Sequence, residues 1–138
     1  MNIQEDFVSF GTAKLLKEKW FDDEYTNAFY DKTGDLYFID LLSGFSEHPD
    51  NDTDVAASTL YVAMKWLREV HNIDIVIEPH LFKEKKATEY RFNYWIDEHY
   101  HMPYSESYPV YHPLYAKTWE SYEEACEAAI KYCLENLI

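Results

Sequence analysis

"NIDIVIEPHLFKEKKATEYRFNYWID", residues 72–97, decides the fold, because two alternating runs flank a short charged turn. In the first run Ile73, Ile75 and Ile77 fall on one side of an extended chain, whose side chains point alternately to opposite faces. The second run, residues 88–97, repeats this alternation with Tyr90, Phe92, Tyr94 and Ile96. The pattern predicts a β-hairpin with one face in the core and the other in water.

A shorter hairpin and a helix are predicted before this stretch. Residues 27–40, NAFYDKTGDLYFID, contain two aromatic runs around a turn in which Gly34 can supply a positive φ. The segment SFGTAKLLKEKWF, residues 9–21, predicts a first helix with Ser9 as its N-cap. The expected apolar stripe of this helix consists of Ala13, Leu16 and Trp20.

Two further helices are predicted, one before and one after the long hairpin. The earlier one runs from about Val55 to His71, and its candidate N-caps are Thr53, Asp54 and Ser58. The last helix starts with the capping box SYEE, in which Ser121 is the N-cap and Glu124 reaches back to its amide. Its apolar stripe comprises Tyr122, Ala125, Cys126, Ala129, Ile130, Cys133 and Leu137. The two cysteines are expected to be buried free thiols, because their separation along a helix exceeds disulfide reach.

The predicted elements follow the order α-β-β-α-β-β-α, which indicates an α+β protein. We expect a single domain over residues 1–138, with the two hairpins joined in an antiparallel four-stranded sheet and the helices packed on one face. The 138 residues, of which 47% are hydrophobic, suffice for one core. Residues 98–118, rich in aromatic residues and interrupted by prolines, are expected to form a loop.

The charge balance excludes several classes of partner. Twelve basic residues face 26 acidic ones, a formal net charge of −14. Such a surface opposes direct nucleic-acid binding, which depends on basic side chains, and also opposes anionic membranes. A protein partner remains, and a basic one fits best, unless the acidity serves solubility alone. The opening MNIQEDFVSF has no signal-peptide pattern and no apolar run spans a membrane, so a cytoplasmic location is expected.

The segments FVSFGTAKLLKEKWFDD (7–23), AMKWLREVHNIDI (63–75) and SYEEACEAAIKYCLENLI (121–138) resemble a family of small acidic proteins encoded by prophages and other mobile elements of gut anaerobic bacteria. The likeness covers about half of the chain. It implies a bacterial cytoplasmic accessory protein, and it carries over no catalytic residue. Members of the family have glycine where Trp20 stands and a shorter segment before the last helix. Residues 98–118 are therefore expected to be particular to this chain.

The stretch DEHYHMPYSESYPVYHP, residues 97–113, concentrates the groups that could act chemically. His99 and His101 would point to one side of a strand, as ligands of one metal must, but a third ligand at a recognisable distance is lacking. We therefore expect no metal and no cofactor. The residues of this alternative pocket are Asp97, His99, His101 and His112.

The tyrosines of the same region suggest a different use. They recur every three or four residues, but the prolines exclude a regular helix. The rings then either cover the open face of the sheet or are presented to a partner, since tyrosine gives a large contact area at low entropic cost. The candidate binding residues are Tyr100, Tyr104, Tyr108, Tyr111 and Tyr115.

Together these features favour a non-enzymatic, acidic protein-interaction domain of a bacterial mobile element. It would bind a protein through the aromatic loop and the exposed face of the sheet. The alternative is a small enzyme or ligand-binding domain with a pocket between sheet and loop, lined by His, Asp and Tyr. A concave pocket with converging polar groups would favour the alternative, and an exposed aromatic patch would favour the interaction domain.

Overall fold

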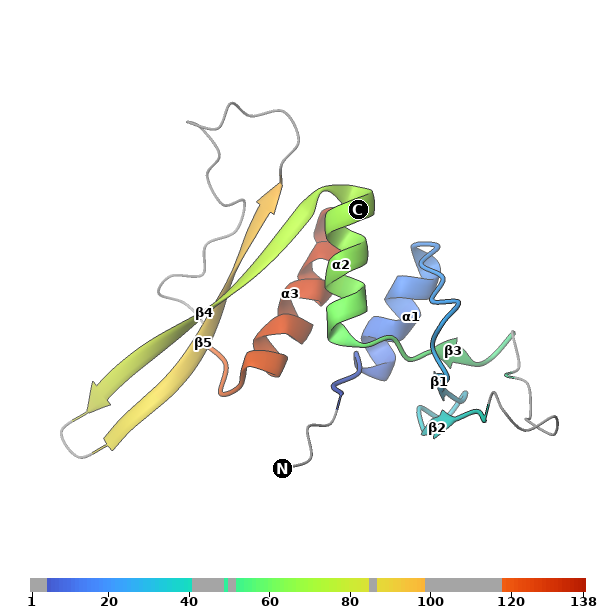
Figure 1. Cartoon of the computed structure of the whole chain (residues 1–138), viewed down its shortest axis with the longest axis horizontal. Coiled ribbons are helices and arrows are strands. Elements are labelled where there is room, and N and C mark those ends of the chain that lie inside the picture. The colour runs from blue at the N-terminus through green and yellow to red at the C-terminus, as the bar shows by residue number, and fades with distance from the viewer. Residues whose placement is uncertain (1–4, 41–48, 50–51, 85–86, 99–117) are drawn as a thin grey trace. The chain divides into compact units, whose positions relative to one another are not determined.

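The computed structural model confirms the α+β class (Figure 1). It describes residues 5–40, 49, 52–84, 87–98 and 118–138. The chain forms two compact units, Met1–Ala63 and Met64–Ile138. The predicted loop 98–118 lies outside the described residues, except for its two ends.

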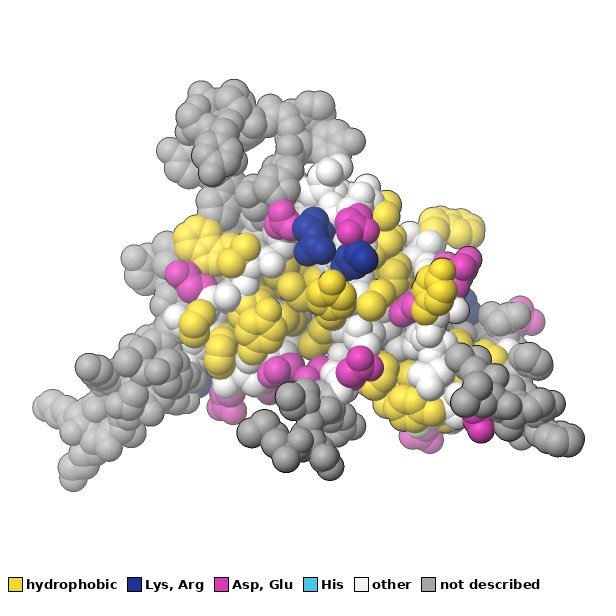
Figure 2. Space-filling model, in the orientation of Figure 1, with side chains coloured by type: hydrophobic (Ala, Val, Ile, Leu, Met, Phe, Trp, Pro, Cys, Tyr) yellow, Lys and Arg dark blue, Asp and Glu magenta, His cyan; other side chains and the backbone are white. Residues whose placement is uncertain are grey.

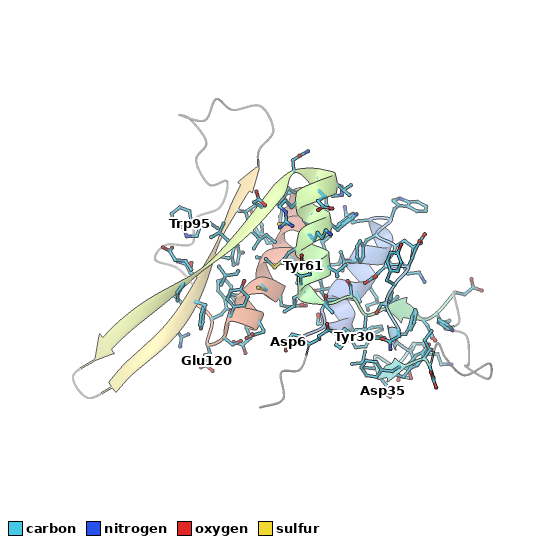
Figure 3. The ribbon with its side chains drawn as sticks, viewed as in Figure 1. Asp6, Tyr30, Asp35, Tyr61, Trp95 and Glu120 are labelled. Atoms are coloured by element: carbon cyan, nitrogen blue, oxygen red, sulfur yellow. The ribbon has the colours of Figure 1, made fainter. Side chains whose placement is uncertain are left out.

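The first unit contains one helix, a small sheet and the start of a second helix. Its elements are α1 (Phe10–Glu18), β1 (Ala28–Tyr30), β2 (Leu36–Phe38), β3 (Val55–Ala56) and the first turn of α2 (Leu60–His71). Ser9 caps α1 as predicted, because its hydroxyl accepts a hydrogen bond from the Thr12 amide at 3.3 Å. The Tyr30 hydroxyl donates to the Val8 carbonyl at 2.6 Å, which ties β1 to the segment before α1 (Figure 3).

The predicted stripe of α1 is only partly right. Ala13 and Leu16 are buried, but Trp20 lies beyond the end of the helix and is 92% exposed. The chain leaves the helix at Lys19, and Trp20 adopts a left-handed backbone with φ of 63°. The side chain therefore points away from the stripe that the helical spacing predicted.

The short hairpin is confirmed, but its sheet has a third strand. Gly34 has φ of 88° in the turn, as predicted. On the other side of β1, Tyr30 pairs with Val55 and Phe29 with Ala56, so the sheet order is β2-β1-β3. The prediction that Val55 begins the second helix is wrong, because this pairing holds Val55 and Ala56 in an extended conformation.

The second helix begins later than expected, at Leu60. None of the three predicted N-caps caps it. Instead, the Thr59 hydroxyl accepts a hydrogen bond from the Val62 amide at 3.2 Å, which is the geometry of an N-cap. The helix ends at His71, and Asn72 follows in a left-handed conformation that asparagine tolerates better than most residues.

The second unit contains the rest of α2, the long hairpin and α3. Its strands and last helix are β4 (Ile73–Glu84), β5 (Ala87–Glu98) and α3 (Tyr122–Asn136). The register pairs Ile75 with Ile96 and Ile77 with Tyr94, which confirms the predicted apolar face. Helix α3 packs against both strands (Figure 1). The opposite face is not uniformly wet, since Asn93 on that side is only 1% exposed.

The start of α3 is confirmed almost as predicted. The Ser121 hydroxyl accepts from the Glu124 amide at 3.0 Å, and the Glu124 carboxylate accepts from the Glu120 amide rather than from the Ser121 amide. The buried residues are Ala125, Cys126, Ala129, Ile130, Cys133 and Leu134. Leu134 therefore belongs to the stripe, whereas Tyr122 is exposed and Leu137 is half-buried. Both cysteines are free and buried, as expected.

The predicted four-stranded sheet is wrong. The described strands form two separate antiparallel sheets, one of three strands and one of two. In the first sheet, β3 pairs with the edge of β1 that β2 leaves open. The second hairpin would have to pair at that edge to form the predicted four-stranded sheet. In the second, the segment before α3 reaches β5, where Trp119 and Phe92 form an antiparallel bridge. The helices therefore cannot share one face of a common sheet.

Candidate functional site

The loop between α1 and β1, residues 19–27, is the most unusual surface of the first unit, and we call it the Trp20 loop. Its sequence is KWFDDEYTN. Trp20 is 92% exposed and Tyr25 is 91% exposed, the two highest values among the exposed large hydrophobic residues of the described chain. Asp22 and Glu24 are exposed between them. The loop thus presents two aromatic rings together with carboxylates.

The backbone of Trp20 is part of a Schellman motif that ends α1. The amide of Trp20 donates to the Lys17 carbonyl at 3.1 Å. The next amide, that of Phe21, donates to the Leu16 carbonyl at 3.0 Å. This pair of hydrogen bonds requires a left-handed residue, and glycine usually fills the position because it has no Cβ to clash. Tryptophan adopts the same conformation at a cost of roughly 1–2 kcal/mol.

The rest of the Trp20 loop is held by hydrogen bonds within the first unit. The Asp23 carboxylate accepts from the hydroxyl of Ser58, a fully buried residue, at 2.9 Å. Its other oxygen accepts from the Tyr25 amide at 3.3 Å. The Thr26 hydroxyl donates to the Ala57 carbonyl at 3.0 Å. Because both ends of the loop are anchored, its exposed rings are presented from a fixed backbone.

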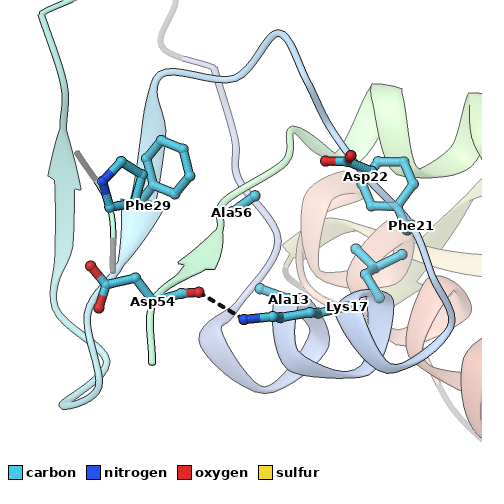
Figure 4. Close-up of a pocket in the computed structure, with 9 residues that line it drawn as sticks. Ala13, Lys17, Phe21, Asp22, Phe29, Asp54 and Ala56 are labelled. Carbon is cyan, nitrogen blue, oxygen red and sulfur yellow. Dashed lines mark hydrogen bonds between the residues drawn. The ribbon is translucent and has the colours of Figure 1, made fainter. Parts of the chain in front are cut away.

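A small cavity of about 160 Å³ lies beside the Trp20 loop, between α1, β1 and β3 (Figure 4). Phe21 and Asp22 of the loop line one side and Phe29 lines another. Lys17 also lines it, and its ammonium donates to the Asp54 carbonyl at 3.1 Å. The carboxylate of Asp54 accepts from the Tyr37 hydroxyl at 2.5 Å. The cavity therefore combines aromatic walls with charged groups of both signs.

The Trp20 loop is mainly negative, because Asp22, Asp23 and Glu24 outnumber Lys19. On the face in Figure 2, Asp and Glu side chains lie among exposed hydrophobic ones, and less of the surface is basic. This agrees with the net charge of −14 for the whole chain. A protein with a basic surface would be attracted to such a loop.

The site residues predicted from the sequence are not tested by this structure. The five candidate tyrosines lie outside the described residues, as do His99, His101 and His112 of the alternative pocket. The backbone of Asp97 lies in β5, where the register places it opposite Asp74. The Trp20 loop was missed, because the helical spacing of Trp20 with Leu16 suggested a buried ring.

The described residues do not assemble a metal site. Within these ranges, no three His, Cys, Asp or Glu side chains are close enough together to hold an ion. No helix in the described ranges is both long and apolar enough to cross a membrane. Burial lowers the pKa of His71 below its usual value, and this ring stacks edge-on against Trp66 at 4.5 Å. His71 thus belongs to the packing at the end of α2.

The chain matches no family model, no curated protein and no solved structure. The resemblance to mobile-element proteins therefore stays a prediction.

Proposed function

We propose that this protein is a non-enzymatic, acidic protein-interaction domain that binds a basic partner protein with Trp20 and Tyr25 as anchors. One observation carries the proposal. Trp20 combines a left-handed backbone with a side chain that is almost wholly in solvent.

Neither property of Trp20 helps the chain to fold. Its ring buries little area, so the hydrophobic stabilisation that a tryptophan usually contributes is absent. Its backbone is strained, and glycine would relieve the strain at no loss of packing. Strained backbone that the surrounding structure maintains is concentrated at functional sites. Exposed tryptophan and tyrosine are also the residues that most often dominate protein–protein interfaces.

The anchored backbone of the Trp20 loop supports the same function. A loop that is ordered before binding loses less conformational entropy when a partner docks. The hydrogen bonds of Asp23 and Thr26 to the buried Ser58–Ala57 segment provide that order. Asp22 and Glu24 add negative charge, which speeds the approach of a basic surface and sets its orientation.

The wider context of the proposal rests on sequence alone. The resemblance suggests an accessory protein of a bacterial mobile element that works in the cytoplasm. The tyrosines of the 98–118 loop would then extend the binding surface, and the partner would be a host protein. We expect no direct binding to nucleic acid or membranes, because the charge opposes both.

A ligand-binding domain is the second candidate, and the cavity beside Lys17 favours it. With Asp22 and Lys17 in its lining and Phe21 and Phe29 in its walls, it could hold a small zwitterionic or aromatic molecule. This site differs from the predicted pocket of Asp97, His99, His101 and His112. A screen of small metabolites by ligand-detected NMR would identify a ligand, and a Phe29→Ala variant should then lose it while Trp20→Gly keeps it.

The test of the interaction function is to place a photo-crosslinking amino acid at position 27 or 61 and to identify captured host proteins. Asn27 is exposed within the Trp20 loop, and its replacement leaves both anchors in place. Position 61 is the control, because Tyr61 is also exposed, at 69%, but lies outside the Trp20 loop. A protein captured from position 27 alone is then purified and its affinity measured. Trp20→Gly should weaken binding strongly, and the association rate should fall as salt rises. Equal affinity of the Trp20→Gly variant would refute the proposal.

A further inference from the structure

The long hairpin of the second unit exposes one edge, and the hydrogen bonds of β5 show which groups face it. The amide and carbonyl of Phe92 both bond to Trp119, at 2.9 and 2.8 Å, on the side of β5 away from β4. In an antiparallel pair of strands, two residues that lie directly opposite each other behave alike. If the N–H and C=O of one point away from the partner strand, those of the other also point away. Phe92 is paired with Pro79, so the backbone groups of Pro79 point away from β5.

This parity extends along β4. Because successive residues alternate, the amides and carbonyls of Ile73, Ile75 and Ile77 also point away from β5. In the part of the chain that the structure describes, no backbone hydrogen bond reaches these three residues from that side. Such a row of outward-facing donors and acceptors is a template on which another strand can form.

Pro79 limits this open edge. It has no N–H, and its position in the register means that the missing donor belongs to the edge and not to the β4–β5 ladder. The hairpin thus loses nothing from the proline, while an added strand would lose a hydrogen bond there. Proline at an outward-facing position is a known device against uncontrolled pairing of edges. Ile73 is only 2% exposed, so its backbone groups are covered, and the usable edge is the segment from Ile75 to Ile77.

We propose that this edge of β4 binds an extended, basic segment of a partner protein as an added strand. The side chains of Asp74, Val76 and Glu78 lie on the face of β4 opposite the apolar stripe that packs on α3. Val76 is 53% exposed, and Glu78 accepts a hydrogen bond from the Trp95 indole at 2.7 Å on the same face (Figure 3).

The side chains of Asp74, Val76 and Glu78 determine which residues the added strand should carry on the same face. Neighbouring strands place side chains beside each other on the same face, and opposite charges and apolar pairs stabilise such neighbours. The bound segment should therefore read basic–x–aliphatic–x–basic, with the basic residues beside Asp74 and Glu78 and the aliphatic one beside Val76. A second copy of this chain does not fit, because two β4 edges would bring acidic side chains together.

The inference is tested with short blocked peptides and the intact protein. The probe has the sequence TKTVTKT, and its binding is followed by amide chemical shifts of the ¹⁵N-labelled chain. Shifts should be centred on Ile75–Ile77. A copy N-methylated at the residues whose amides face β4 should bind about tenfold more weakly or worse, because one or more backbone hydrogen bonds are removed. A TETVTET peptide should not bind.

Variants of the protein sharpen the test. Pro79→Ala restores the missing edge donor, so a longer basic peptide should bind more tightly, although the melting temperature of the protein falls slightly because alanine gives the unfolded chain more freedom. Asp74→Lys should weaken binding of TKTVTKT, whereas Asp52→Lys, an equal change of charge in the first unit, should not. Unchanged affinity of the N-methylated peptide, or shifts outside β4, would overturn the inference. Trp20→Gly should leave peptide binding intact, so failure of strand addition is separate from failure of the interaction proposed for the Trp20 loop.

Discussion

Replacing Trp20 with glycine should make the protein more stable or leave it unchanged, which is the reverse of what loss of a tryptophan usually does. Relief of the left-handed backbone contributes roughly 1–2 kcal/mol. Glycine also gives the unfolded chain more conformational freedom, and this lowers the gain in unfolding free energy by about 0.4–1 kcal/mol. The 92% exposure of Trp20 means that little buried area is lost.

The matched variant is Trp20→Ala, which removes the ring but keeps the strain. The free energy of unfolding of the glycine variant should exceed that of the alanine variant by about 0.5–1 kcal/mol. Urea unfolding followed by far-UV circular dichroism measures both under the same conditions. Partner binding should be lost in both variants, which would separate the role of the ring from the stability of the fold. A glycine variant less stable than the wild type by more than about 1 kcal/mol would show that Trp20 packs against the protein.

The remaining predictions concern the second unit. Ile130→Ala should cost about 2–5 kcal/mol of unfolding free energy, because the side chain is fully buried; an unchanged melting temperature would contradict the packing of α3. Ser121→Ala should cost about 0.5–2 kcal/mol of unfolding free energy through loss of the N-cap, and an unchanged urea midpoint would contradict this capping role. Burial lowers the pKa of His71, so the unfolded state binds a proton more readily and stability should fall as the pH drops below about 6.5. A His71→Gln variant should lose part of this dependence between about pH 7 and 5, and identical pH profiles of the two proteins would refute the assignment.

The two hairpins and the caps of α1 and α3 could be predicted because their signals are local. Alternating residues around a short turn, or a serine before a helix, need no knowledge of the rest of the chain. The apolar face of the long hairpin followed from the same alternation. The pairing of Ile75 with Ile96 is known only from the structure, because a shift by two residues would leave the same side chains on that face.

Strand β3 and the Trp20 loop could not be predicted, because each depends on distant residues. Val55 and Ala56 are compatible with a helix, and only pairing with Tyr30 and Phe29 makes them a strand. Trp20 has the spacing of a residue on the helix stripe, but the helix has already ended, with Lys19 as its C-cap. The open edge of β4 also depends on a distant contact, since the bridge of Phe92 to Trp119 establishes which amides face outward.

The buried thiols of α3 have a practical consequence for measuring how this protein unfolds. Cys126 and Cys133 are at most 1% exposed and are the only cysteines in the sequence, so a thiol reagent can reach them only when α3 opens. Their labelling rate in native buffer therefore reports local opening of the second unit. Hydrogen exchange at the β1–β3 amides reports the first unit independently. Agreement of the two opening free energies would show that the units unfold together, and a difference would show that one opens while the other remains folded.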